Sequence, residues 1–139
     1  MKRLMAVFVA AAAAGGCGGP PGAQVGTPVP THGKVTFADG SPLKGGIVYF
    51  TPLEAETGGK LRYEGAGTVD AKGEYKAGLN GDGAGLVPGE YKITVIPREV
   101  GELPGSNSNK IPAKYKEKGT TDLKATIGTS DNTVDIVLK

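Results

Sequence analysis

Few residues in this chain carry side chains that could perform chemistry. Among 139 residues there is one cysteine, Cys17, and one histidine, His32. A single cysteine cannot form an internal disulfide or a multi-cysteine zinc site, and a serine nucleophile needs a basic partner. His32 ends a stretch rich in proline and glycine, where we interpret it as a solvated linker residue. The sequence therefore predicts a protein with no catalytic activity, no metal and no cofactor.

Calcium is a metal that the aspartates of the chain could bind. Aspartates at or near predicted loops are Asp39, Asp70, Asp82, Asp131 and Asp135. Calcium sites use about six to eight oxygen atoms, usually from closely spaced acidic residues. The nearest approach to such spacing is NGDG at residues 80–83. Because asparagine and glycine suit tight turns, we interpret this segment as a turn.

The first sixteen residues have the three-part layout of a secretory signal. Lys2 and Arg3 form a basic start, an unbroken apolar run covers residues 4–14, and small residues follow. Crossing the hydrocarbon core of a bilayer takes about 20 residues, so this run is too short for a transmembrane anchor. Residues 1–16 are therefore expected to be a signal peptide that directs export.

The residues at the expected cleavage point, Ala14-Gly15-Gly16-Cys17, resemble a bacterial lipobox, although leucine is commonest where this chain has Ala14. The resemblance implies that Cys17 is acylated, so that lipid attaches the protein to a membrane. Two or three acyl chains hold a protein stably, whereas one chain holds it marginally. Gly18 stands where an aspartate often signals inner-membrane retention, which favours the outer membrane. The alternative is an ordinary signal peptide, with Cys17 left as a free thiol.

Removal of the signal peptide changes the charge balance. The full chain has 16 Lys+Arg and 14 Asp+Glu. Lys2 and Arg3 leave with the signal and every acidic residue stays, so the mature chain has 14 basic and 14 acidic residues. Without a basic excess, nucleic-acid binding is not expected. The expected location is the cell envelope, outside the cytoplasm.

A predicted tether follows the signal peptide at residues 17–32. Residues 18–31 hold four prolines, four glycines and no charge. Such a composition forms an extended linker rather than a core, and fourteen residues at about 3.1 Å each reach at most about 43 Å. Residues 33–139 are expected to form a single domain held away from the membrane surface.

From residue 33 onward, apolar and polar residues alternate with the period of two that is typical of β-strands. The segments expected to form strands are 33–37, 47–50, 61–69, 74–77, 91–95, 123–127 and 134–138. Turn sequences lie between them, for example at residues 70–73. The domain is therefore predicted to be all-β, an immunoglobulin-like sandwich of two sheets with about seven strands.

Several of these segments together resemble the carboxypeptidase regulatory-like (transthyretin-like) β-sandwich domain. They are GKVTF at 33–37, PLKGGIVYF at 42–50, GTVDAKGEY at 67–75 and VPGEYKITV at 87–95. IPAKY at 111–115 is similar to a segment of small lipoproteins abundant in planctomycete bacteria. The resemblance covers residues 33–138 and implies a transthyretin-like sandwich. Its motifs consist of turn and core positions, so it implies a scaffold more than a function.

The tyrosines provide one set of candidate contact residues. Tyr75 and Tyr91 fall on predicted core faces, and Tyr91 is expected to anchor a corner of the sandwich. Tyr49, Tyr63 and Tyr115 are expected to be exposed, where aromatic rings could stack on sugars. This pattern is the basis for an alternative function as a carbohydrate-binding module.

The irregular segment 97–119 provides the second set. A long segment without alternation is often functional, and this one could contact an anionic glycan, a lipid headgroup or an envelope protein. Four lysines cluster in it: Lys110, Lys114, Lys116 and Lys118. The alternative is a solvated crossover in which Ile111 and Tyr115 pack against the core. We expect a non-catalytic binding or structural module, or alternatively an accessory domain of an enzyme.

Overall fold

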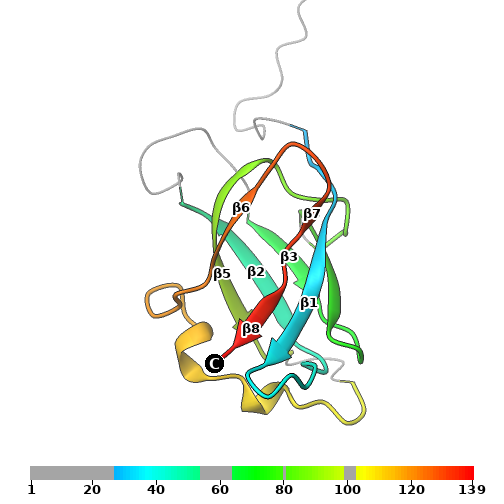
Figure 1. Cartoon of the computed structure of the whole chain (residues 1–139), viewed down its shortest axis with the longest axis vertical. Helices are drawn as coiled ribbons and strands as arrows, with labels where there is room; N and C mark the ends of the chain where they lie inside the picture. The colour runs from blue at the N-terminus through cyan, green and yellow to red at the C-terminus, as the bar shows by residue number, and fades with distance from the viewer. Residues whose placement is uncertain (1–26, 54–63, 80, 99–102) are drawn as a thin grey trace, which may run out of the picture.

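Figure 1 shows the computed structural model, which describes residues 27–53, 64–79, 81–98 and 103–139. The elements in chain order are β1 (Thr31–Phe37), β2 (Ile47–Pro52), β3 (Gly65–Thr68), β4 (Glu74–Leu79), β5 (Gly89–Ile96), the 3-10 helices η2 (Ser108–Lys110) and η3 (Ala113–Tyr115), β6 (Lys124–Ile127), β7 (Asn132–Thr133) and β8 (Ile136–Leu138). The predicted all-β class is confirmed. No helix in these ranges is long and apolar enough to span a membrane.

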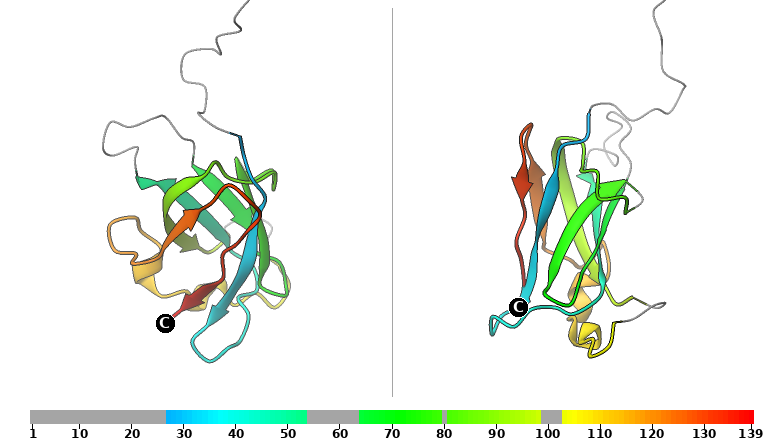
Figure 2. Two further views of the ribbon diagram at one scale, coloured as in Figure 1. Left: turned by 45° about the horizontal axis from the view of Figure 1, so that its top comes forward. Right: turned by 90° about the vertical axis from the view of Figure 1, so that its right-hand side faces the viewer.

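The strands belong to one sheet with the order β6-β5-β2-β3-β4-β1-β7, and β8 also pairs with β1. The ladders are antiparallel except those that join β1 to β7 and to β8. The sheet curls until β6 and β7 lie close together, so it nearly closes into a barrel (Figures 1 and 2). This curled sheet encloses the core.

The alternating pattern of the sequence accounts for the core. Tyr91, Ile93 and Val95 point inward from β5 and are at most 1% exposed. The ring of Phe50 packs against Tyr75 and Tyr91, with ring centroids 6.0 and 6.2 Å apart. Each large side chain that is fully buried contributes about 1.5–3 kcal/mol to folding. These strands therefore fix the body of the fold, as their alternation predicts.

The chain joins the sheet earlier than the predicted tether boundary. β1 starts at Thr31, so His32 is a strand residue and its interpretation as a linker residue is wrong. Before it, Val29 exchanges two backbone hydrogen bonds with Leu86, at 2.9 and 3.0 Å. Gly85 makes this approach possible, because a Cβ there would lie 2.1 Å from the carbonyl oxygen of Val29. The N-terminal end of β1 is thereby fastened to the loop that precedes β5.

The last predicted strand, 134–138, is shorter than expected, because β8 covers Ile136–Leu138 and the short strand β7 precedes the predicted segment at Asn132–Thr133. The Tyr75 hydroxyl donates a hydrogen bond to the Val134 carbonyl at 2.5 Å, which removes that carbonyl from strand pairing. Gly33 leaves room for the contact, because a Cβ there would lie 1.9 Å from the same oxygen. The chain therefore forms β7 before this point and β8 after it.

The predicted strand 61–69 can be followed only in part. Its described residues form β3, while Leu61 and Tyr63 lie outside the described residues. β3 pairs with β2 over four residue positions and with β4 over two. β3 therefore joins β2 to β4 within the curled sheet.

Residues 103–122, here called the cap segment, cross one end of the curled sheet. Ile111 and Tyr115 insert from this segment into the core and are 3% and 2% exposed. In Figure 1 the chain enters β1 at the top, whereas η2 and η3 lie at the bottom. The cap segment and the point of entry are therefore at opposite ends of the domain.

Candidate functional site

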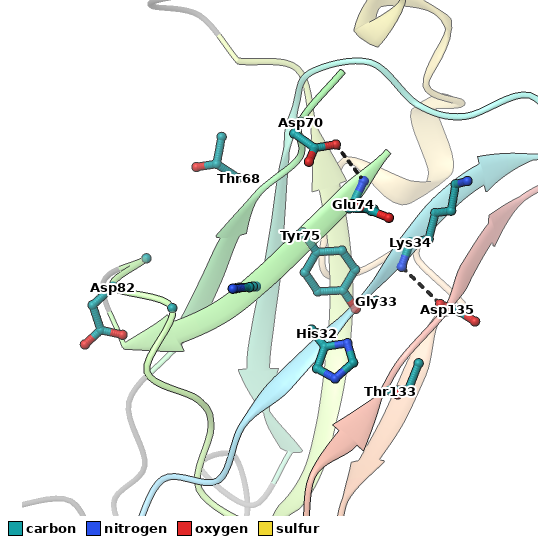
Figure 3. Close-up of a pocket in the computed structure, with 13 residues that line it drawn as sticks. His32, Gly33, Lys34, Thr68, Asp70, Glu74, Tyr75, Asp82, Thr133 and Asp135 are labelled. Carbon is teal, nitrogen blue, oxygen red and sulfur yellow. Dashed lines mark hydrogen bonds between the residues drawn. The ribbon is translucent and has the colours of Figure 1, made fainter. Parts of the chain in front are cut away.

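A surface hollow of about 660 Å³ lies over β1 and β4 and is the first candidate site (Figure 3). The loops after β3 and β4 and the junction between β7 and β8 complete its rim. Its ionisable residues, apart from Tyr75, are His32, Lys34, Asp70, Glu74, Lys76, Asp82 and Asp135. A hollow with so many charged groups could bind a ligand or perform acid–base chemistry, so the engagement of each group matters.

Three of the four carboxylates of the hollow, those of Asp70, Asp82 and Asp135, accept hydrogen bonds from the backbone. Asp70 accepts the amide N–H groups of Lys72 at 2.8 Å and Glu74 at 2.9 Å, which closes the turn between β3 and β4. Asp135 accepts the amide N–H of Lys34 at 3.0 Å, where strand pairing is interrupted. These groups stabilise the backbone, in the way short acidic side chains do in turns.

The remaining charges of the hollow are mixed in sign. Lys34 lies opposite Glu74 in the β1–β4 ladder, and His32 lies opposite Lys76. The Nε2 atom of His32 is 3.3 Å from a carboxylate oxygen of Asp131, and the His32 side chain is half-buried whereas that of Asp131 is exposed. Neighbouring charges of opposite sign partly cancel, so the hollow does not present one strong potential to a ligand.

Tyr75 forms part of the hollow's floor but is a structural residue. Burial, and to a smaller extent the charge of Asp135, raises the pKa of its phenol well above the usual range. The hydroxyl stays protonated and donates a hydrogen bond to the Val134 carbonyl. A phenol held in this way is a poor acid near neutral pH.

The cap segment is the second candidate site, and Asn107 fastens it to the loop between β1 and β2. The Asn107 side chain accepts the Lys44 amide N–H at 2.7 Å and donates to the Pro42 carbonyl at 3.1 Å. The Ser106 hydroxyl donates to the Lys44 carbonyl at 2.9 Å. Uncharged side chains thus hold this irregular segment against the sheet.

Tyr115 is a second fastening of the cap segment, so the expectation that it is an exposed contact residue is wrong. Its ring is 2% exposed. Its hydroxyl accepts the Lys139 amide N–H at 3.1 Å and donates to the Lys139 carbonyl at 3.3 Å. Ile111 is buried beside the core as well. The alternative interpretation, in which both residues pack against the core, describes the structure.

Lys114 is exposed at the surface of the cap segment. Its ammonium nitrogen lies 4.6 Å from the centroid of the Tyr115 ring and 3.9 Å from a carboxylate oxygen of Asp122. A hydrogen bond with Tyr115 and the charge of Asp122 raise the pKa of Lys114. The ammonium therefore stays charged while its position is restrained by an aromatic ring.

The other lysines of the cap segment differ in how they are paired. Lys118 forms an ion pair with Glu64 at 2.7 Å. Lys110 is exposed and Lys116 is half-buried, and neither forms an ion pair with another residue in the described ranges. The three predicted contact lysines, Lys110, Lys114 and Lys116, thus lie in the part of the chain that crosses one end of the sheet.

The predicted tyrosine platform is not assembled among the described residues. Tyr49 is half-buried on β2, Tyr115 is buried, and Tyr63 lies outside the described ranges. Tyr91 anchors a corner as predicted, because its hydroxyl donates to the Val87 carbonyl at 2.6 Å. Tyr49 alone is a small surface for stacking on a sugar.

Asn107 and Lys44 are the residues of this region that sequence reasoning missed. They lie 63 positions apart in the chain, and no local pattern marks such a pair. Among the described residues there is no group of three or more His, Cys, Asp or Glu side chains that could hold a metal ion.

Comparison with known proteins does not assign either candidate site. No protein-family model, curated protein or solved structure matches the chain. The function therefore has to follow from the chemistry of the hollow and of the cap segment.

Proposed function

We propose that this chain is a non-catalytic binding or structural module, exported and held at the cell envelope through acylated Cys17. The observation that carries the proposal is the placement of two features. The chain enters the fold at one end, while the cap segment with its lysines crosses the other end (Figure 1). A domain attached by its entry end keeps the cap segment available to partners in the envelope.

The fold shortens the proposed attachment. Val29 is hydrogen-bonded to Leu86, so eleven residues, 18–28, separate Cys17 from the folded domain. At about 3.1 Å per residue this segment spans at most about 34 Å. Such a length holds the domain clear of lipid headgroups but close to the membrane, with the outer membrane favoured by Gly18.

The absence of catalysis belongs to the same proposal and is supported by the hollow. Asp70 and Asp135 are engaged by backbone amides, and Tyr75 is buried with its hydroxyl bonded. His32 lies next to Asp131 at the surface. A catalytic site requires ionisable groups that converge on a substrate, whereas these groups stabilise turns and strand ends.

The finer fold assignment, a transthyretin-like sandwich, is proposed as well. Two features support it. β3 and β4 are paired over only two residue positions, so the sheet bends sharply there, and the Tyr91 corner contact is typical of sandwiches. In this view β6-β5-β2-β3 forms one face and β4-β1-β7, with β8 beside β1, forms the other.

A direct test is the mass of the N-terminal peptide of the full-length protein isolated from membranes of a bacterial host. The expected result is a chain that begins at Cys17 and carries acyl groups. In the Cys17→Ser control, the acyl mass is absent and the precursor accumulates uncleaved. Wild-type protein with an unmodified Cys17, or recovered entirely in soluble fractions, would overturn the proposal.

A further inference from the structure

We infer that the cap segment binds an anionic polysaccharide, with Lys44, Lys110, Lys114 and Lys116 contacting its acidic groups. The inference rests on the proposed function and names the class of partner that the tethered module binds. It follows from the spacing, charge and rigidity of this surface and from the place where the tether joins the fold.

The backbone places these lysines near one another. The Lys44 amide N–H donates to the Asn107 side chain at 2.7 Å, and the Lys110 amide N–H donates to the Asn107 carbonyl at 2.9 Å. Lys114 lies in η3, which follows η2 after two residues. Asn107 is therefore the centre of a small network that carries lysines from two distant parts of the chain.

The cap segment has an excess of positive charge. Residues 103–122 contain four lysines against Glu117 and Asp122, whereas the mature chain as a whole has equal numbers of basic and acidic residues. Lys44 adds a further exposed lysine beside this segment. Glu64 pairs with Lys118 and Asp39 interacts with the charge of Lys110, so five lysines face four carboxylates and the surface keeps a small positive excess. A local excess of one sign on a neutral protein attracts ligands of the opposite sign to that surface.

The lysines are displayed on a backbone that is already ordered. Asn107 and Ser106 fix the segment to the β1–β2 loop, and Ile111 and Tyr115 fix it to the core. The Lys114 ammonium is restrained by the Tyr115 ring. Binding a polyanion therefore requires little further ordering of the backbone, which lowers the entropic cost of association.

The polar character of the surface favours a polysaccharide over a protein. Stable protein interfaces have an apolar centre, but the exposed large hydrophobic residue among those described is Val137, on β8, which is outside the cap segment. The anchoring bilayer is disfavoured as partner because the tether joins the domain at the opposite end (Figure 1). An anionic polysaccharide of the envelope needs neither an apolar centre on this surface nor a position next to the anchoring bilayer.

The test uses the full-length protein in detergent and immobilised polygalacturonate, with neutral dextran as the control polymer. Two charge-matched variants are compared: K44Q/K110Q/K114Q in the cap segment and K34Q/K72Q/K76Q around the hollow. All six lysines are exposed. Circular dichroism and thermal unfolding check that both variants remain folded.

Wild type is expected to bind polygalacturonate and not dextran, with affinity that falls as salt is raised. The cap variant is expected to lose about tenfold or more in affinity. The matched variant should lose less than about twofold, because the hollow has four carboxylates against Lys34 and Lys76 and therefore repels a polyanion. Equal losses in both variants would show non-specific charge attraction and overturn the inference. Absence of wild-type binding, or equal binding to anionic lipid vesicles, would overturn it too.

The inference and the proposed function fail in different ways. If Cys17 is unmodified but the cap variant alone loses polygalacturonate binding, the site stands and the lipid anchor is wrong. If Cys17 is acylated but wild type does not bind the polymer, the anchor stands and the assigned partner is wrong.

Discussion

The cap segment and the hollow both carry several charged residues, but they use them differently. In the hollow, Asp70 and Asp135 accept backbone hydrogen bonds, and Lys34 lies opposite Glu74 in the β1–β4 ladder. In the cap segment, the uncharged Asn107 and Ser106 hold the backbone. There Lys114 and Lys118 pair with Asp122 and Glu64, whereas Lys110 and Lys116 form no ion pair in the described ranges. The difference teaches that charges which hold the backbone in place favour a structural role, whereas the proposed binding site relies on charges that the fold leaves at its surface.

The two regions also differ in the reach of their hydrogen bonds. Asp70 bonds amides two and four residues away, which closes a local turn. The side chain of Asn107 bonds residues 63 and 65 positions away. Long-range contacts of this kind join separate parts of the fold, so losing them should loosen the cap segment as a unit.

The largest predicted effect is on the core contact of the cap segment. Tyr115→Ala removes a buried aromatic ring and should lower the free energy of unfolding by about 3–5 kcal/mol, measured by urea denaturation. Tyr115→Phe keeps the ring and loses the hydrogen bonds to Lys139, so it should cost about 1 kcal/mol. A cost below about 1 kcal/mol for the alanine variant would mean that the cap segment is not packed into the core.

A smaller effect is predicted for the polar fastenings. Asn107→Ala removes two hydrogen bonds, to the exposed Lys44 amide and the partly buried Pro42 carbonyl, and should cost about 1–3 kcal/mol in all. Asp135→Ala, the matched change at the hollow, removes one hydrogen bond at an exposed site and should cost about 0.5–1.5 kcal/mol. Urea denaturation of both variants gives the order, and the reverse order would contradict the distinction between the regions.

In the hollow, Tyr75 should make the free energy of unfolding depend on pH in the alkaline range. The fold raises the pKa of this phenol, whereas an unfolded tyrosine has a pKa near 10. Below about pH 10 both states keep the proton, and above it the unfolded chain loses the proton first, so stability should fall as pH rises. Tyr75→Phe should flatten this alkaline slope in denaturation experiments between pH 8 and 11, the range chosen to bracket about pH 10. An unchanged slope would show that another group causes it.

The smallest effects are expected at the surface lysines. Lys110→Gln should change the free energy of unfolding by less than about 0.5 kcal/mol, and Lys118→Gln, which breaks the pair with Glu64, by at most about 1 kcal/mol. Thermal unfolding measures both. A larger loss for Lys110→Gln would give this lysine a structural role and weaken its assignment to ligand binding.

Alternation of apolar and polar residues predicted those strands in which the local residue order decides which side chains face the core. Tyr91 and Ile93 are buried as expected because a period of two reports which face of a strand is covered. The interruption near Val134 was not predictable, since it depends on a hydroxyl from Tyr75, 59 positions away. Local patterns carry no information about such contacts.

The candidate site was predictable only as a list of residues. The lysine cluster is visible in the sequence, but nothing local distinguishes the exposed Lys110 from the buried Tyr115 in an irregular segment. Their difference arises from packing across the end of the sheet and from the Asn107 contacts to the β1–β2 loop. Such contacts join segments that only the three-dimensional fold brings together.

The central claim is that the cap segment is a fixed surface, and hydrogen exchange of the full-length protein tests it most directly. The Lys44 and Lys110 amides, both bonded to Asn107, should exchange far more slowly than an unstructured chain, and Asn107→Ala should accelerate both. The Lys72 amide, bonded to Asp70 at the hollow, should be unaffected by that variant. Rapid exchange of the Lys44 and Lys110 amides in the wild-type protein would contradict the account.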